Sequence, residues 1–129
     1  MRYVVLIYTN SATWKHPLFL QDGETLSEQE RADRVAQHVN LVEEIRTSGE
    51  LLTAAALAAP AEGTRLSALG GVPSPTDGPF PDAKEYLAGV FFLECDSPER
   101  AAEIASRFPD AKVGSVEIRP VDEISEKDF

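Results

Sequence analysis

Runs of consecutive apolar residues along the chain predict the strands of one sheet. Tyr3–Tyr8 shows no polar alternation, which indicates a strand that is covered on both faces and central in its sheet. Leu87–Cys95 has the same character and predicts a second central strand. Val113–Val121 alternates apolar with polar side chains, so it predicts a strand with one buried and one exposed face.

Two helices are predicted from their start signals and their apolar spacing. Ser27 and Glu30 are placed as a capping box, and Ser48-Gly49 provides the stop of a helix of about five to six turns. Ser97-Pro98 is an N-cap with proline at the first helical position, and Pro109 ends this second, shorter helix. The apolar stripes of the two helices are Ala32, Val35, Ala36, Val39, Val42 and Ile45, and Ala101, Ala102, Ile104, Ala105 and Phe108.

The middle of the chain is expected to add a hairpin and a stiff loop. Leu51–Ala59 is apolar, Pro60–Gly63 has turn chemistry and Thr64–Leu69 alternates in part, which together predict two paired strands. The alanines of the first run also favour helix, so the strand prediction there depends on its context. Val72–Pro81 holds four prolines and Gly78, and we expect a loop that neither helix nor sheet crosses.

The predicted order β-α-β-β-β-α-β belongs to an α+β protein, a ferredoxin-like plait with one added hairpin strand. Two helices cover only one face of such a sheet, so the other face exposes more apolar surface than a monomer normally does. The simplest cover is a second copy packed sheet against sheet about a two-fold axis, and we expect a homodimer. Residues 1–121 form one domain in this interpretation, and residues 122–129 form an acidic tail.

Composition limits the partners and the compartment. With 12 basic and 22 acidic side chains the formal net charge is −10, which disfavours nucleic acid and anionic membrane surfaces as partners. Many acidic residues lie at the ends of elements, as Asp96, Glu99 and Asp110 do, or in the tail 122–129, which is expected to be solvated. The one cysteine excludes an intramolecular disulfide, and the sequence shows neither a secretory leader nor an apolar run of membrane-spanning length. We therefore expect a cytoplasmic protein.

His38 and Asp77 are the first candidates for chemistry, and each has a structural alternative. Helical geometry places His38 at the border of the buried face, where a histidine is often only hydrogen-bonded in place. Asp77 is the only ionisable residue between Arg65 and Asp82 and precedes Gly78-Pro79, so it also fits an Asx-turn that bonds its own backbone. A histidine beside a carboxylate accepts protons well, because the carboxylate orients the ring and favours its charged form.

Other side chains have two interpretations each. Trp14, in the long loop 9–26, and Phe80, in the proline loop, are either a lid over a pocket or a hydrophobic clasp. Arg119 shares a strand face with Glu117, so it either forms a surface ion pair or binds a substrate carboxylate. Cys95 is a small buried hydrophobe or, beside a helix start, a nucleophile. The sequence has no zinc spacing, phosphate loop or nucleophile elbow, so no metal or cofactor is expected.

The segment Thr76–Phe80, followed by Ala83–Glu85, resembles the signature of the DGPF branch of the YCII-related domain family. The resemblance covers most of the chain. It begins with Arg2–Tyr8, continues through Trp14 and a histidine in the first long helix, and closes with Gly114–Val121. These features in this order are more specific than the short motif alone.

The resemblance implies a dimeric α/β barrel in which His38 is the partner of Asp77. We expect from it a small cofactor-independent enzyme that uses this pair for acid/base chemistry, as a lyase, isomerase or hydrolase, on a small organic molecule. Trp14, Phe80 and Arg119 are the predicted substrate-binding residues. The alternative is a non-catalytic module on the same fold that binds a small molecule or a regulatory protein.

Overall fold

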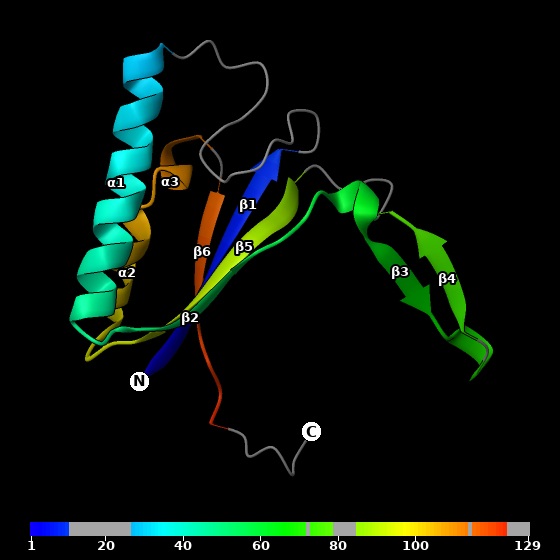
Figure 1. Cartoon of the computed structure of the whole chain (residues 1–129). Coiled ribbons are helices and arrows are strands. Elements are labelled where there is room, and N and C mark those ends of the chain that lie inside the picture. Colours follow the sequence, from blue (N-terminus) through cyan, green and yellow to red (C-terminus); the bar gives the residue numbers. More distant parts are fainter. Residues whose placement is uncertain (11–26, 72, 79–84, 114, 124–129) are drawn as a thin grey trace.

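A computed structural model describes residues 1–10, 27–71, 73–78, 85–113 and 115–123. These residues form a four-stranded sheet and a separate two-stranded sheet, with the helices on one face of the larger sheet (Figure 1). No helix in the described part of the chain is long and apolar enough to span a membrane. In chain order the elements are β1 (Arg2–Asn10), α1 (Glu28–Thr47), β2 (Leu51–Ala56), η2 (Pro60–Glu62), β3 (Thr64–Ser67), η3 (Leu69–Gly71), β4 (Ser74–Asp77), β5 (Glu85–Glu94), α2 (Pro98–Ser106), α3 (Asp110–Val113) and β6 (Ser115–Pro120).

β1 and β5 are the central strands of the larger sheet, as the sequence predicts, because the strand order is β2-β5-β1-β6. All its strand pairs are antiparallel, and Val5 of β1 lies opposite Phe91 of β5 and Ile118 of β6. α1 crosses from β1 to β2, and α2 with α3 crosses from β5 to β6, each time over one intervening strand. This α+β arrangement is consistent with the expected ferredoxin-like plait.

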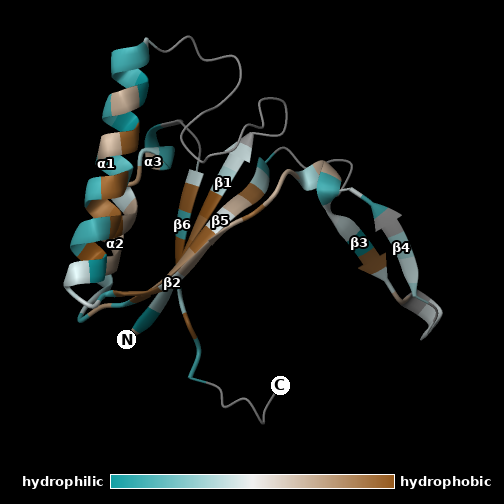
Figure 2. Ribbon diagram, viewed as in Figure 1, coloured by the Kyte–Doolittle hydropathy of each residue, from teal (hydrophilic) through white to brown (hydrophobic). Residues whose placement is uncertain are grey.

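The two faces of the larger sheet are covered differently. Val5 and Leu93 point to the helices and are 0% exposed. Leu6 and Val90 point to the other face and are only partly buried, and Phe92 on that face is 37% exposed. Figure 2 shows that hydrophobic residues are concentrated in the strands of this sheet and are interspersed with hydrophilic ones along α1. In one chain the central strands are therefore covered on one face, whereas their sequence predicts cover on both.

α1 begins and ends as predicted, but it buries a different face. The Ser27 hydroxyl accepts the Glu30 N–H at 3.1 Å, and the Glu30 carboxylate accepts the Ser27 N–H at 3.4 Å, which confirms the capping box. The helix buries Leu41 and Ile45, whereas Val39, which belongs to the predicted stripe, is 50% exposed. The row Leu41–Ile45 faces the sheet, and this rotation leaves Val39 on a flank of the helix.

The predicted hairpin is wrong in its pairing. β2 pairs with β5, where Ala54 lies opposite Phe91, and the turn at Pro60–Glu62 separates β2 from β3. β3 pairs with β4 in the two-stranded sheet, which projects from the body on the side away from α1 (Figure 1). The proline segment thus contains the strand Ser74–Asp77 where its composition predicts a loop.

Pro75 is compatible with β4 because of its place in the hydrogen-bond pattern. The Gly78 N–H donates to the Gly63 carbonyl at 2.7 Å, one register step beyond the last pair of the ladder. Hydrogen-bonded and non-hydrogen-bonded pairs alternate in an antiparallel ladder, so Leu66 and Pro75 form a non-hydrogen-bonded pair. The ladder loses no bond at Pro75, because a backbone N–H at that position would point away from β3.

Candidate functional site

His38 lies near the middle of α1, half-buried between the helix and the sheet, as its helical position predicts. Its ring centroid is 5.9 Å from that of Phe108 and 6.1 Å from that of Phe91, and the second contact is edge-to-face at 67°. Burial lowers the pKa of the imidazole from its ordinary value of 6.5. The ring is therefore neutral at physiological pH, the form in which an imidazole accepts a proton.

One flank of α1 is held by the chain that follows α2. The side-chain amide of Gln37 donates to the Arg107 carbonyl oxygen at 2.9 Å. The Arg107 guanidinium in turn donates to both carboxylate oxygens of Glu44, at 2.6 and 3.1 Å. These bonds fix the rotation of the helix and hence the direction of His38.

The opposite flank of α1 borders a hollow of about 390 Å³. Its described lining consists of His38, Val39, Val42, Glu43 and Arg46, all from α1. Val39 and Val42 provide an apolar wall, and Glu43 and Arg46 provide one charge of each sign. The wall of the hollow thus includes a neutral imidazole and, about two helical turns further along α1, a guanidinium that is suited to carboxylate recognition.

One carboxyl group at the end of an element is buried. Asp110 is 2% exposed, and burial raises the pKa of its carboxyl group to about 7. It follows Phe108-Pro109 directly and begins α3, which packs against β1 and β6. The available signal was an acidic residue right after a buried Phe-Pro pair, in a link too short to leave the sheet. From the sequence, Asp110 was noted only as an acidic residue at the end of an element and was assigned no role.

The structure does not bring His38 and Asp77 together within one chain. Asp77 is exposed at the end of β4, in the two-stranded sheet that projects on the side of the molecule away from α1 (Figure 1). Gly78, with φ +83°, follows it at the turn that the sequence predicts. Trp14 and Phe80, two of the predicted substrate-binding residues, lie outside the described residues.

Arg119 lies on the open face of the larger sheet, opposite Val4 of β1. Glu117 shares this face, as predicted, and its carboxylate accepts a hydrogen bond from the Tyr8 hydroxyl at 3.3 Å. Burial, followed by the charge of Glu117 and this bond, raises the pKa of Tyr8, and the charge of Arg119 opposes the shift. Because His38 lies over the helix face, the structure places Arg119 and His38 on opposite sides of the sheet.

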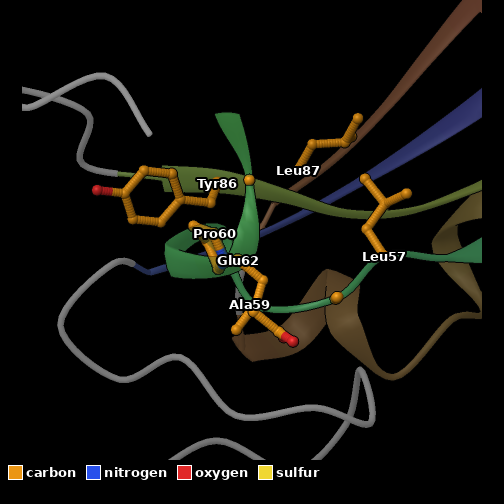
Figure 3. Close-up of a pocket in the computed structure, with 8 residues that line it drawn as sticks. Leu57, Ala59, Pro60, Glu62, Tyr86 and Leu87 are labelled. Atoms are coloured by element: carbon orange, nitrogen blue, oxygen red, sulfur yellow. The ribbon is translucent and has the colours of Figure 1, made fainter. Parts of the chain in front are cut away.

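A second hollow, of about 340 Å³, lies where the projecting two-stranded sheet leaves the body (Figure 3). Leu57, Ala59 and Pro60 border it from the segment after β2, and Tyr86 and Leu87 border it from the start of β5. Its wall is mainly apolar, and its described lining includes the Glu62 carboxylate but no histidine. Cys95 is buried elsewhere, at the end of β5, and burial raises the pKa of its thiol, which favours the structural interpretation of this residue.

The chain is a small α+β domain. A half-buried neutral histidine lies over one face of its antiparallel sheet, and a buried carboxyl group lies at the end of the same core, so the domain contains one candidate base and one candidate acid. Among the described residues there is no group of three or more side chains that could hold a metal ion.

The chain belongs to the YCII-related domain family, whose sequence model matches residues 1–125. No match was found among the curated proteins. Among solved structures, the chain is similar to the 5-chloro-2-hydroxyhydroquinone dehydrochlorinase TftG from Burkholderia phenoliruptrix AC1100, in complex with 2,5-dihydroxybenzoquinone. The two are 14% identical, the match covers 95% of this chain and 94% of the other, and the TM-score is 0.46.

Proposed function

We propose that this chain is a small cofactor-independent enzyme that performs acid/base chemistry on a small organic molecule, with His38 as the proton acceptor. The observation that carries the proposal is the neutral, half-buried imidazole in the wall of the hollow beside α1. A neutral imidazole removes a proton from a bound molecule, and Arg46 in the same wall attracts an anionic group. Small organic acids are therefore the favoured substrates.

Three reaction types suit a lone base of this kind: proton removal beside a carbonyl, an elimination catalysed by a lyase, and activation of a water molecule. Phe91 and Phe108 support the base because they restrict the orientation of the ring. The low polarity that they create also keeps the imidazole neutral.

The predicted pairing of His38 with Asp77 requires a second copy of the chain in this arrangement, since α1 and β4 stand apart within one copy (Figure 1). We include a homodimer in the proposal. Its support is the open sheet face, where Leu6, Val90 and Phe92 are only partly covered. Arg119 lies on that face, so a substrate contact from Arg119 would also depend on the dimer.

The test is a turnover screen with small organic acids, followed by mass spectrometry, on wild type and on His38→Gln. We expect turnover in the wild type and a loss of about 100-fold or more in the variant, the range found when a general base is removed. Arg46→Gln should raise KM more than it lowers kcat. Asn40→Ala, at an exposed position of the same helix, is the control and should leave both constants unchanged. Turnover that survives in His38→Gln would contradict the proposal.

The second candidate function is a binding module without catalysis, and the hollow is as suitable for that role. The same panel distinguishes the two functions through thermal stability. A ligand that raises the melting temperature of the wild type and of His38→Gln, with no product from either, favours the binding module.

A further inference from the structure

Two polar side chains are buried at one end of the helix-side core. Asp110 is 2% exposed and Thr9 is 5% exposed. Within the described residues, the Oδ1 atom of Asp110 and the Oγ1 atom of Thr9 have no hydrogen-bond partner. Buried polar atoms in folded proteins are nearly always paired, because an unpaired one destabilises the fold. Such exceptions call for an explanation beyond stability.

The strand register brings these two residues to the same end of the sheet. β6 begins at Ser115, which lies opposite Tyr8 of β1, so the short helix before β6 is adjacent to the last residues of β1. α3 packs against both β1 and β6. Asp110 is the first residue of α3, and Thr9 is buried at the end of β1 on the helix side.

The same part of the core contains His38. Phe108, two residues before Asp110, has its ring 5.9 Å from the imidazole. Arg34, one turn before His38 on the same side of α1, is the charged group that acts on the Asp110 carboxyl group from that helix. Three ionisable side chains of the flanking strands lie at this end of the sheet: Tyr8 and Glu117 bond each other on the opposite sheet face, and the Glu85 carboxylate accepts a hydrogen bond from the Ser115 hydroxyl at 2.7 Å.

We propose that Asp110, at the same end of the sheet as Thr9, is the acidic half of the His38 site, a neutral carboxylic acid that hydrogen-bonds an oxygen atom of the bound molecule while His38 removes a proton. This inference rests on the proposed function. It makes small carbonyl compounds the favoured substrate class. The burial of both groups supports this assignment. Burial raises the pKa of Asp110 to about 7 and lowers the pKa of His38, so that an acid and a base coexist near neutral pH.

The step balances without any further reactant. The imidazole takes a proton from the carbon next to the carbonyl group, and the electron pair of that C–H bond forms a C=C bond. The carbonyl oxygen takes the proton of Asp110. The products are an enol, an imidazolium and a carboxylate, and the reverse transfers restore both side chains.

The deciding experiment is a titration of the full chain by NMR, which follows the Asp110 carboxyl carbon and the His38 ring nitrogens. We expect Asp110 to titrate near pH 7, and the His38 shifts to respond at that same pH. Asp110→Asn should abolish this response, and the exposed Asp96→Asn should preserve it. An Asp110 that titrates below about pH 5, or a His38 curve that is unchanged in Asp110→Asn, would overturn the proposal.

Stability separates this role from a merely structural one. The folded pKa of Asp110 lies above its ordinary value of 3.8, so the folded state binds more protons and loses stability as the pH rises from about 4 to about 7. Asp110→Asn should therefore be at least as stable as the wild type at pH 8, while kcat falls by at least about tenfold. A variant that loses stability at pH 8 would instead mark Asp110 as structural.

The two proposals fail in different ways. If His38→Gln keeps full turnover, the proposed function is wrong whatever Asp110 does. If His38→Gln is inactive but Asp110→Asn keeps both kcat and the pH profile of the wild type, the function stands and the acidic role of Asp110 is wrong.

Discussion

Phe91 and Phe92 are neighbours in β5 that point to opposite faces of the larger sheet. Phe91 is 5% exposed and packs against Phe108, with ring centroids 4.6 Å apart, whereas Phe92 is 37% exposed on the open face. A charge at Phe91 should therefore unfold the chain. Phe91→Asp is expected to destabilise it by about 4 kcal/mol or more, measured by chemical denaturation.

The same change at Phe92 tests the homodimer. If a second copy covers the open face, Phe92→Asp should give a monomer in sedimentation equilibrium at micromolar concentration and should lower the melting temperature. An interface of about 1,600 Å² is large enough for a stable association. A wild type that sediments as a monomer would contradict the dimer, and Phe92→Asp would then reduce stability only slightly.

The pH profile of activity tests the state of His38. Because burial lowers the pKa of the imidazole from its ordinary value of 6.5, the acidic limb of kcat/KM should be centred below pH 6.5. The remaining activity of His38→Gln should lack this acidic limb. An acidic limb that is centred above pH 6.5 would show that the ring is not desolvated.

The ion pair between Arg100 and Glu50 gives a second pH prediction. The guanidinium donates from Nε and Nη2 to the two carboxylate oxygens, both at 2.8 Å, and lowers the pKa of Glu50 to about 2. A depressed carboxylate pKa contributes stability that is present above pH 4.5 and is lost as the pH falls toward 2. Glu50→Gln should cost about 2 kcal/mol at pH 7 and flatten this acid limb in urea denaturation. Glu103 also pairs with Arg100, but its side chain is 57% exposed. Glu103→Gln is therefore the control and should change the free energy of unfolding little.

Local signals carried most of what the sequence predicts correctly. The Ser27–Glu30 capping box and the N-cap at Ser97 depend on a few adjacent residues, and the structure contains both. The two central strands were also predicted, since a continuous apolar run indicates burial without reference to any partner. The coarse α+β class follows from these elements.

The remaining features depend on partners that are distant in sequence. The pairing of β3 with Ser74–Asp77 was missed because prolines argue against a strand unless the register places them at non-hydrogen-bonded positions. The burial of Asp110 depends on the packing of α3 against β1, and no local sequence pattern indicates that packing. Residues of the candidate site come from elements far apart in the chain, so the sequence identified His38 by its helix face and missed Asp110.

The last prediction concerns the pairing of His38 with Asp77, which within this structure needs two copies of the chain. His38→Gln and Asp77→Asn should each be inactive alone, although Asp77→Asn should fold normally because Asp77 is exposed. A heterodimer of the two variants would contain one site in which His38 of one copy meets Asp77 of the other. Mixing them in equal amounts, with exchange of subunits, should restore about a quarter of the wild-type activity.

A pairing within one chain gives the opposite result, because every site in the mixture then carries one of the two substitutions. The mixture would stay inactive although the heterodimer forms, which tags on the two variants would verify by co-purification. Full activity of Asp77→Asn alone would remove Asp77 from the site. In that case Asp77 is a turn residue, consistent with its place ahead of Gly78, whose φ is +83°.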